Sequence, residues 1–108
     1  MNLGKENETT EFKESTSEKR EACEAIAAIL NKHSRGDVYF GVFDNGDIKG
    51  QEITDSTIKD VSEIISTNIE PRIVPTIENL VIDNKSVLKI SFYGNQKPYS
   101  AFGKFLIR

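Results

Sequence analysis

The chain has few of the residues that small proteins use as covalent or metal cross-links. It contains one cysteine, one histidine and no tryptophan among its 108 residues. A single cysteine cannot form an internal disulfide, and no Cys/His cluster offers the ligands of a structural zinc site. Stability must therefore come from an ordinary hydrophobic core, in which we expect Cys23 to be a small buried side chain.

Long apolar runs and an excess of basic residues are missing as well. No stretch approaches the roughly 20 apolar residues of a membrane-spanning helix, and the opening residues MNLGKE lack the apolar centre of an export signal. We therefore expect a cytoplasmic protein with no membrane partner. The formal net charge of -3 argues against the strong, non-specific binding of nucleic acid that a general basic excess produces.

What the chain does contain is the composition of one globular domain spanning residues 1–108. Hydrophobic residues make up 37% and charged residues 29% of the chain. The charges are unevenly distributed: acids concentrate in residues 6–24 and 44–70, whereas residues 85–108 hold five Lys or Arg and no acid. A local basic patch in the last third is compatible with the acidic total.

The hydrophobic pattern predicts an α+β domain, a mostly antiparallel sheet with two helices packed on one face. A short strand at 10–13 precedes a helix that begins near Ser15 with a capping-box pattern and ends near 31–33. A second helix begins near Asp55 and ends at Glu70, because Pro71 disfavours a helical conformation there. Residues 72–82 and 87–92 form a hairpin, 105–108 begin a last strand, and the polar residues 1–9 are expected to be poorly ordered.

Residues 31–50 are the most informative run. A polar loop at 31–36 precedes an apolar strand, and Asn45-Gly46 predicts a two-residue hairpin turn within residues 38–50. The loop offers backbone N–H groups, Lys32 and Arg35 to phosphates, although it could equally be a solvated connector. His33 has no acidic or serine partner in the sequence pattern, so we expect a surface donor and not a general base.

Several short motifs carry a resemblance to a known family. They are Glu11-Phe12-Lys13, Tyr39-Phe40-Gly41-Val42 with the return Gly46-Asp47-Ile48-Lys49-Gly50, then Asn68-Ile69-Glu70-Pro71, and finally Pro98-Tyr99-Ser100-Ala101-Phe102-Gly103. Together they resemble the Schlafen AlbA_2 family over nearly the whole chain. The resemblance implies the non-catalytic, DNA-binding N-terminal module of a longer bacterial transcriptional regulator, with further regulator domains downstream.

Family proteins are often helicase-related or ATP-binding, and that activity would belong to a downstream domain. Gly41, Gly46 and Gly50 lack the strand-to-helix turn of a nucleotide-binding fingerprint, so we expect no cofactor here. The partner is DNA or RNA, a choice the sequence leaves open together with homodimer formation. The residues expected to contact phosphates are Lys13, Lys32, Arg35, Lys49, Lys97 and Lys104.

Aromatic and strand residues near these bases have two interpretations each. Tyr99 and Lys104 could contact unpaired bases at the surface, whereas Phe102 is expected to pack into the core. Alternation in the first strand predicts that Phe12 faces the core and that Glu11 and Lys13 share the opposite face. That pair could meet a ligand, or it could be an edge-strand charge pattern that prevents aggregation.

Two alternative functions remain. Some Schlafen proteins cut RNA with a divalent metal held by three carboxylates, and Glu6, Glu11 and Asp44 resemble that set in spacing; Mg²⁺ or Mn²⁺ would then be the cofactor. Glu6 lies in a polar segment and Asp44 suits a turn, so we expect at most two of the three to converge. The third function is a protein-interaction or dimerisation module with an acidic surface.

Overall fold

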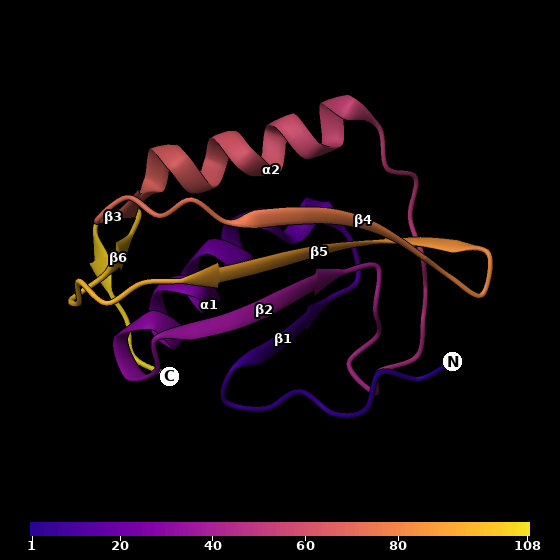
Figure 1. The fold of residues 1–108 in the computed structure, drawn as a ribbon, viewed down its shortest axis with the longest axis horizontal. Coiled ribbons are helices and arrows are strands. Elements are labelled where there is room, and N and C mark those ends of the chain that lie inside the picture. Colours follow the sequence, from indigo (N-terminus) through magenta and orange to yellow (C-terminus); the bar gives the residue numbers. More distant parts are fainter.

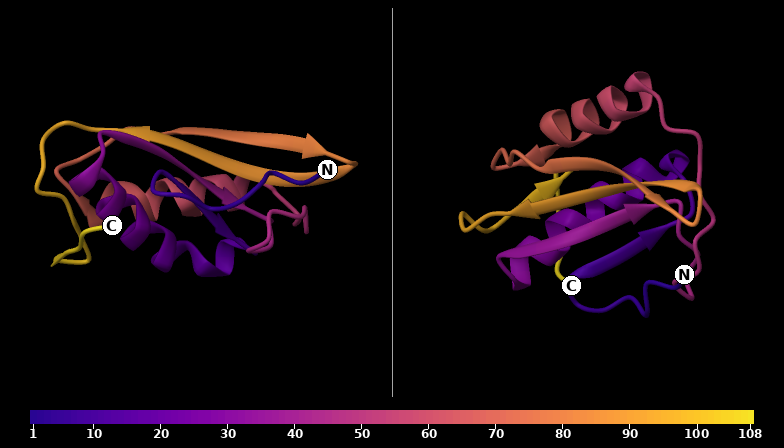
Figure 2. Two further views of the ribbon diagram at one scale, coloured as in Figure 1. Left: turned by 90° about the horizontal axis from the view of Figure 1, so that it is seen from below. Right: turned by 45° about the vertical axis from the view of Figure 1, so that its right-hand side comes forward.

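The computed structural model describes residues 1–108 and has two layers, a sheet and a pair of helices (Figure 1). The mixed sheet has the strand order β1-β2-β5-β4, and β3, β6 and β7 form a second, short sheet. Both helices lie on the same side of the large sheet (Figure 2, left). The predicted α+β class is confirmed. The elements are β1 (Thr10–Lys13), the 3-10 turn η1 (Thr16–Glu18), α1 (Lys19–Lys32), β2 (Arg35–Phe40), α2 (Asp55–Asn68), β3 (Ile69–Glu70), β4 (Thr76–Ile82), β5 (Lys85–Tyr93), β6 (Ser100–Ala101) and β7 (Lys104–Phe105).

Neither helix has the length and apolar character needed to cross a bilayer.

The strands β1 and β2 run parallel because α1 connects them, whereas β2, β5 and β4 pair antiparallel. Ser15 caps η1 by accepting a hydrogen bond from the Ser17 N–H, and α1 follows. Glu18 accepts from the Glu14 N–H, so the predicted capping box at Ser15 is not formed.

The predicted polar loop at 31–36 is wrong in extent. Asn31 and Lys32 belong to α1, and Arg35 already begins β2, which leaves His33 and Ser34 as the connection. Gly36 is buried, and a Cβ there would lie 2.9 Å from an Ile29 methyl and 3.0 Å from the Phe92 ring. The glycine is required by packing against α1 and β5.

The predicted hairpin at 38–50 is reduced to a short tip. A single bridge joins Val42 and Ile48, and the Gly46 N–H donates to the Phe43 carbonyl. Gly46 has φ 91° and follows Asp44 and Asn45, whose φ values are not positive, which is a three-residue loop instead of the two-residue Asn-Gly turn. The predicted second hairpin is correct, because Asp83 and Asn84 have φ of 52° and 63° between β4 and β5.

The N-terminal segment is attached to this tip, contrary to the expectation of poor order. The Leu3 N–H donates to the Gly46 carbonyl over 2.9 Å, and Asn2 Nδ2 donates to Asp47 Oδ1 over 2.7 Å. Leu3 also packs against a small cluster on the open side of the sheet, made of Phe12, Val42, Ile48 and Val87. These apolar contacts explain why a polar sequence is fixed in place.

The helix ends follow their capping residues. Thr54 and Thr57 form a reciprocal capping box at the start of α2, and α2 ends at Asn68, two residues before the predicted boundary. Ile69 and Glu70 instead pair with Ala101 and Ser100 of β6. Of the predicted last strand at 105–108, only Phe105 is in a strand, β7.

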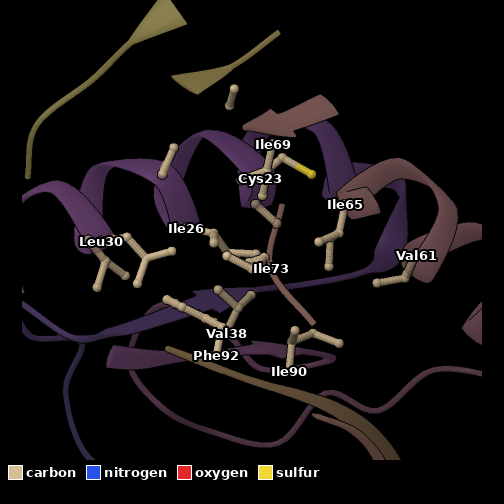
Figure 3. Packing of buried hydrophobic residues seen from close by; sticks show 14 of the residues in the cluster. Cys23, Ile26, Leu30, Val38, Val61, Ile65, Ile69, Ile73, Ile90 and Phe92 are labelled. Carbon is tan, nitrogen blue, oxygen red and sulfur yellow. The ribbon is translucent and has the colours of Figure 1, made fainter. Parts of the chain in front are cut away.

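The main core lies between the two helices and the sheet (Figure 3). Ile26 and Leu30 of α1 and Val61 and Ile65 of α2 contribute to it from above the strands, and Val38, Ile90 and Phe92 contribute from β2 and β5. Cys23 is 1% exposed within this cluster, and burial raises the pKa of its thiol to about 12. The expectation of a small buried side chain is therefore confirmed.

Truncating a buried and an exposed phenylalanine side chain should have very different effects on the free energy of unfolding. Phe40 is 1% exposed and Phe105 is 69% exposed. We expect Phe40→Ala to lower the free energy of unfolding by about 3–5 kcal/mol, and Phe105→Ala to change it by about 0.5 kcal/mol or less. Urea unfolding followed by circular dichroism measures both, and equal losses would contradict the assigned core.

Candidate nucleic-acid interface

The end of α1, the start of β2 and the end of β5 meet at one end of the sheet. The two-residue connection His33-Ser34 holds α1 and β2 together, and the Gly94 N–H donates to the Ser34 carbonyl over 2.9 Å. The chain segment after β5 is thereby attached to the start of β2. Residues about 60 positions apart in sequence become neighbours here.

Asn31 fixes the other end of this segment. Its Nδ2 donates to the carbonyls of Tyr99 (2.8 Å) and Leu106 (2.6 Å), and its Oδ1 accepts from the Tyr99 N–H (2.5 Å). Its amide is therefore occupied by the protein's own backbone and is not available to a phosphate. Tyr99 is 1% exposed, so the expected surface contact is wrong, and its hydroxyl accepts from the Gln96 N–H.

Between these two attachments lies a surface hollow of about 540 Å³, which we call the basic hollow. It is lined by Thr9, Leu30, Lys32, His33, Ser34, Arg35, Gly94, Asn95 and Lys97. Three of the six basic residues predicted to contact phosphates, Lys32, Arg35 and Lys97, are thus brought together. Arg35 and Lys97 have no ion-pair partner in the structure, whereas Lys32 is paired with Glu8.

Glu8 does not line the basic hollow, but it contacts two residues that do. It forms an ion pair with Lys32 and lies 3.4 Å from His33 Nε2. The hydrogen bonds and charges of Lys32 and then of His33 hold the pKa of Glu8 below its ordinary value. Glu8 therefore stays ionised at neutral pH and offsets part of the positive charge.

The other three predicted bases lie elsewhere, and each is next to a carboxylate. Lys13 pairs with Glu11 (3.2 Å), Lys49 with Glu14 (3.5 Å) and Lys104 with Glu24 (3.7 Å). Lys13 and Glu11 do share one face of β1, but the register aligns them with Phe40 and Val38 on the helix side of the sheet. Phe12 is buried on the opposite side, in the small cluster with Val42.

A second, larger hollow of about 700 Å³ adjoins the basic hollow on the face of the sheet that the helices do not cover. We call it the sheet-face hollow; its lining includes Arg35, Asp37, Val74, Lys89, Ser91 and Tyr93. Ser91 Oγ donates to Asp37 Oδ1 over 2.8 Å, and Lys89 Nζ lies 5.6 Å from the centre of the Tyr39 ring. Apart from Arg35, none of these residues stands out in the sequence as a contact, although the alternation of Lys89, Ser91 and Tyr93 along β5 is the signal that places those three on one face.

Of the three carboxylates of the nuclease alternative, Glu6 is close enough to the charges of Glu11 and Asp44 for its pKa to respond to both. Burial, then the charge and hydrogen bonding of Glu11, and finally the charge of Asp44 raise the pKa of Glu6, against a backbone hydrogen bond at Phe12. Burial also acts to raise the pKa of Glu11, but Arg108 at 2.7 Å and Lys13 outweigh it and hold that pKa below its ordinary value. No group of three or more His, Cys, Asp or Glu is arranged so that it could hold a metal ion.

The raised pKa of Glu6 predicts a pH-dependent stability. Between the ordinary and the raised pKa the folded chain binds more protons than the unfolded chain, so stability falls as the pH rises through this interval. We expect Glu6→Gln to stabilise the fold at pH 7 and to lose that advantage below about pH 4.3, the ordinary value of a glutamate. Thermal melts at several pH values, with the exposed Glu52→Gln as the surface-charge control, measure the effect. A variant less stable than the original chain at pH 7 would contradict this assignment.

Two solved structures show the same fold. The DIP2311 protein from Corynebacterium diphtheriae superposes with a TM-score of 0.70 at 19% identity, over 88% of this chain and 19% of that one. The N-terminal domain of a DNA helicase RecG-related protein from Nitrosomonas europaea gives 0.60 at 15% identity, over 82% of this chain and 63% of that one.

The chain thus spans about a fifth of the length of the first of these proteins. No curated protein matches the sequence. The profile of the family described as Schlafen, AlbA_2 matches residues 6–108. Because this match includes the strand β1, both helices and both hollows, the chain belongs to the Schlafen AlbA_2 family.

Proposed function

We propose that this domain binds DNA or RNA through the basic hollow and that binding, without catalysis, is its biochemical role. The observation that carries the proposal is the convergence of Lys32, Arg35 and Lys97 from separate segments on one hollow. Guanidinium and ammonium groups beside a concave surface are the groups that hold phosphates. Ser34 and Asn95, which also line the hollow, add polar groups of the kind that position a nucleic-acid backbone.

The setting of the domain supports the same proposal. One structure with this fold is part of a DNA helicase RecG-related protein, and the other is part of a chain about five times as long. We propose accordingly that the domain works in the cytoplasm as the nucleic-acid-binding module of a longer bacterial transcriptional regulator. Its net charge of -3 and the Glu8 carboxylate imply weak binding that depends on the local arrangement of bases.

Salt dependence tests how many phosphates the hollow engages. Each neutralised phosphate contributes a slope of about -0.9 in log affinity against log salt for duplex DNA and about -0.7 for single strands. Three converging cations predict a slope no steeper than about -3. Fluorescence anisotropy of a labelled oligonucleotide between 25 and about 200 mM salt measures the slope.

The variant Arg35→Ala should weaken binding roughly fivefold, because it removes one unpaired guanidinium from the hollow. It should also reduce the magnitude of the salt slope by about one phosphate contact. Lys59→Ala is the matched control, since Lys59 is exposed on α2 and lies 3.9 Å from Glu63, away from the hollow. Equal affinities for the two variants, both folded by circular dichroism, would place the binding surface elsewhere.

A metal-dependent ribonuclease is the second candidate, and the proximity of Glu6, Glu11 and Asp44 favours it. Against it, Arg108 and Lys13 already neutralise Glu11, so the carboxylate that a cation would need is engaged in ion pairs. A metal-binding carboxylate set must leave its oxygens free for the cation. We therefore propose that these acids contribute structure and charge.

Incubation with a structured RNA and Mn²⁺ separates the two candidates. We expect no cleavage above the buffer control, and the same result from Glu6→Gln. Cleavage by the original chain that needs Mn²⁺ and disappears in Glu6→Gln would establish the nuclease and overturn the non-catalytic proposal. Cleavage that both proteins show would indicate a contaminating ribonuclease.

A further inference from the structure

We propose that the sheet-face hollow receives an unpaired base, which stacks on Tyr93, so that the domain prefers single-stranded nucleic acid to duplex. This inference rests on the proposed function, because the phosphate of the same nucleotide would lie in the basic hollow. It adds the substrate class that the basic hollow alone does not define. Its carriers are Tyr93, Val74 and Asp37.

Tyr93 is an exposed aromatic side chain at the site. It is 76% exposed at the end of β5, although Phe92 beside it is 4% exposed in the core. The antiparallel register places Tyr93 directly opposite Arg35. A ring next to a guanidinium is the combination on which bases stack, because every base offers a flat face whatever its sequence.

Val74 supplies a second apolar surface at the same hollow. It is 80% exposed and precedes β4, the strand on the other side of β5 from β2. Large exposed side chains of this kind leave apolar area in water, and covering them with a flat apolar ligand is favourable. The lining therefore contains an aromatic and an aliphatic group beside polar strand residues.

The floor of the hollow suits a base better than a phosphate. Ser91 uses one carboxylate oxygen of Asp37, and Asp37 Oδ2 has no hydrogen-bond partner in the protein. A carboxylate repels a phosphate but accepts hydrogen bonds from the ring N–H and amino groups of bases. The ammonium of Lys89, which also lines the hollow, lies over the Tyr39 ring.

The two hollows are continuous, since both are lined by Ser34, Arg35, Gly94 and Asn95. A backbone held at Lys32, Arg35 and Lys97 would therefore present its neighbouring base to Tyr93. In a duplex the bases are stacked and paired, so they cannot turn a face toward the protein without being flipped out. Single strands pay no such cost, which is the reason for the expected preference.

Four probes of equal length test the inference: single-stranded DNA, single-stranded RNA, the corresponding duplex, and a single strand whose bases are replaced by abasic sites. The abasic strand keeps the phosphates and removes the stacking partner. We expect the chain of residues 1–108 to bind both base-containing single strands more tightly than the duplex or the abasic strand, in anisotropy titrations at one salt concentration. The two sugar types distinguish a DNA ligand from an RNA ligand.

Tyr93→Ala should weaken single-strand binding about fivefold to a hundredfold, the range found when a stacking aromatic is truncated. Tyr93→Phe should retain most of the affinity, because the ring remains. The matched control is Phe43→Ala, which removes a 38% exposed aromatic from the tip at the opposite end of β2. Binding of the abasic strand should be unchanged in all three variants.

The outcomes separate this inference from the proposed function. If Arg35→Ala weakens all four probes but Tyr93→Ala weakens none, the basic hollow binds nucleic acid and the stacking inference is overturned. If Tyr93→Ala weakens the abasic strand as much as the ordinary one, the loss is structural and the inference fails as well. If no probe binds at low salt, the proposed function fails and the inference fails with it.

Discussion

The side chain of Asn31 is the contact on which the arrangement of this end of the molecule depends. One amide group at the last turn of α1 satisfies both backbone groups of Tyr99 and the carbonyl of Leu106. A buried backbone N–H or C=O group without a partner lowers the stability of the fold by about 1–3 kcal/mol. The Asn31 side chain supplies hydrogen-bond partners to three such groups. Because Tyr99 is fixed in this way, the segment that carries Lys97 lies beside Lys32 and Arg35 instead of extending into solvent.

The charges of the domain are arranged by position and not by abundance. Of the five lysines predicted to contact phosphates, four are paired with a nearby acid, namely Lys13, Lys32, Lys49 and Lys104. Arg35 and Lys97 are exceptions because the segments around them, at the start of β2 and after β5, carry no acid except Asp37. An acidic protein can therefore present a positive surface at one end, and the balance of the whole chain says little about the sign of that surface.

Local patterns predicted the elements well and the tertiary placement of single residues poorly. The apolar spacing of α1, the start of α2 near Asp55 and the β4–β5 hairpin all follow from neighbours in sequence, and the structure confirms them. Asn31 and Tyr99 were assigned to the surface because their decisive partners are 68 residues apart, a separation that no local pattern reports. The order of the N-terminal segment could not be predicted for the same reason. Leu3 packs against the cluster that contains Val42 and Ile48, about 40 positions away, and the polar sequence around Leu3 does not report this contact.

The basic hollow was predictable in part. The charges of Lys32, Arg35 and Lys97 are visible in the sequence. Their convergence depends on the Ser34–Gly94 hydrogen bond and on the hydrogen bonds between the Asn31 amide and the backbone of Tyr99. Tyr93 and Asp37 were not selected, because an aromatic at the end of an alternating strand and an acid within one are ordinary features in sequence. Both residues line a hollow on the face of the sheet that the helices leave uncovered. That face is defined only by the strand order β1-β2-β5-β4 and by the position of both helices on the other side (Figure 2).

The segment between Gly94 and Tyr99 is held at its two ends by main-chain hydrogen bonds and by one buried ring. Gly94 cannot accept a larger side chain, because a Cβ there would lie 2.2 Å from the Tyr99 hydroxyl. The exposed side chains of Asn95, Gln96 and Lys97 between these anchors are not needed to keep the anchors in place. These three side chains can therefore be substituted without removing the contacts that hold the segment, so the residues that meet a ligand are set independently of the core beneath them.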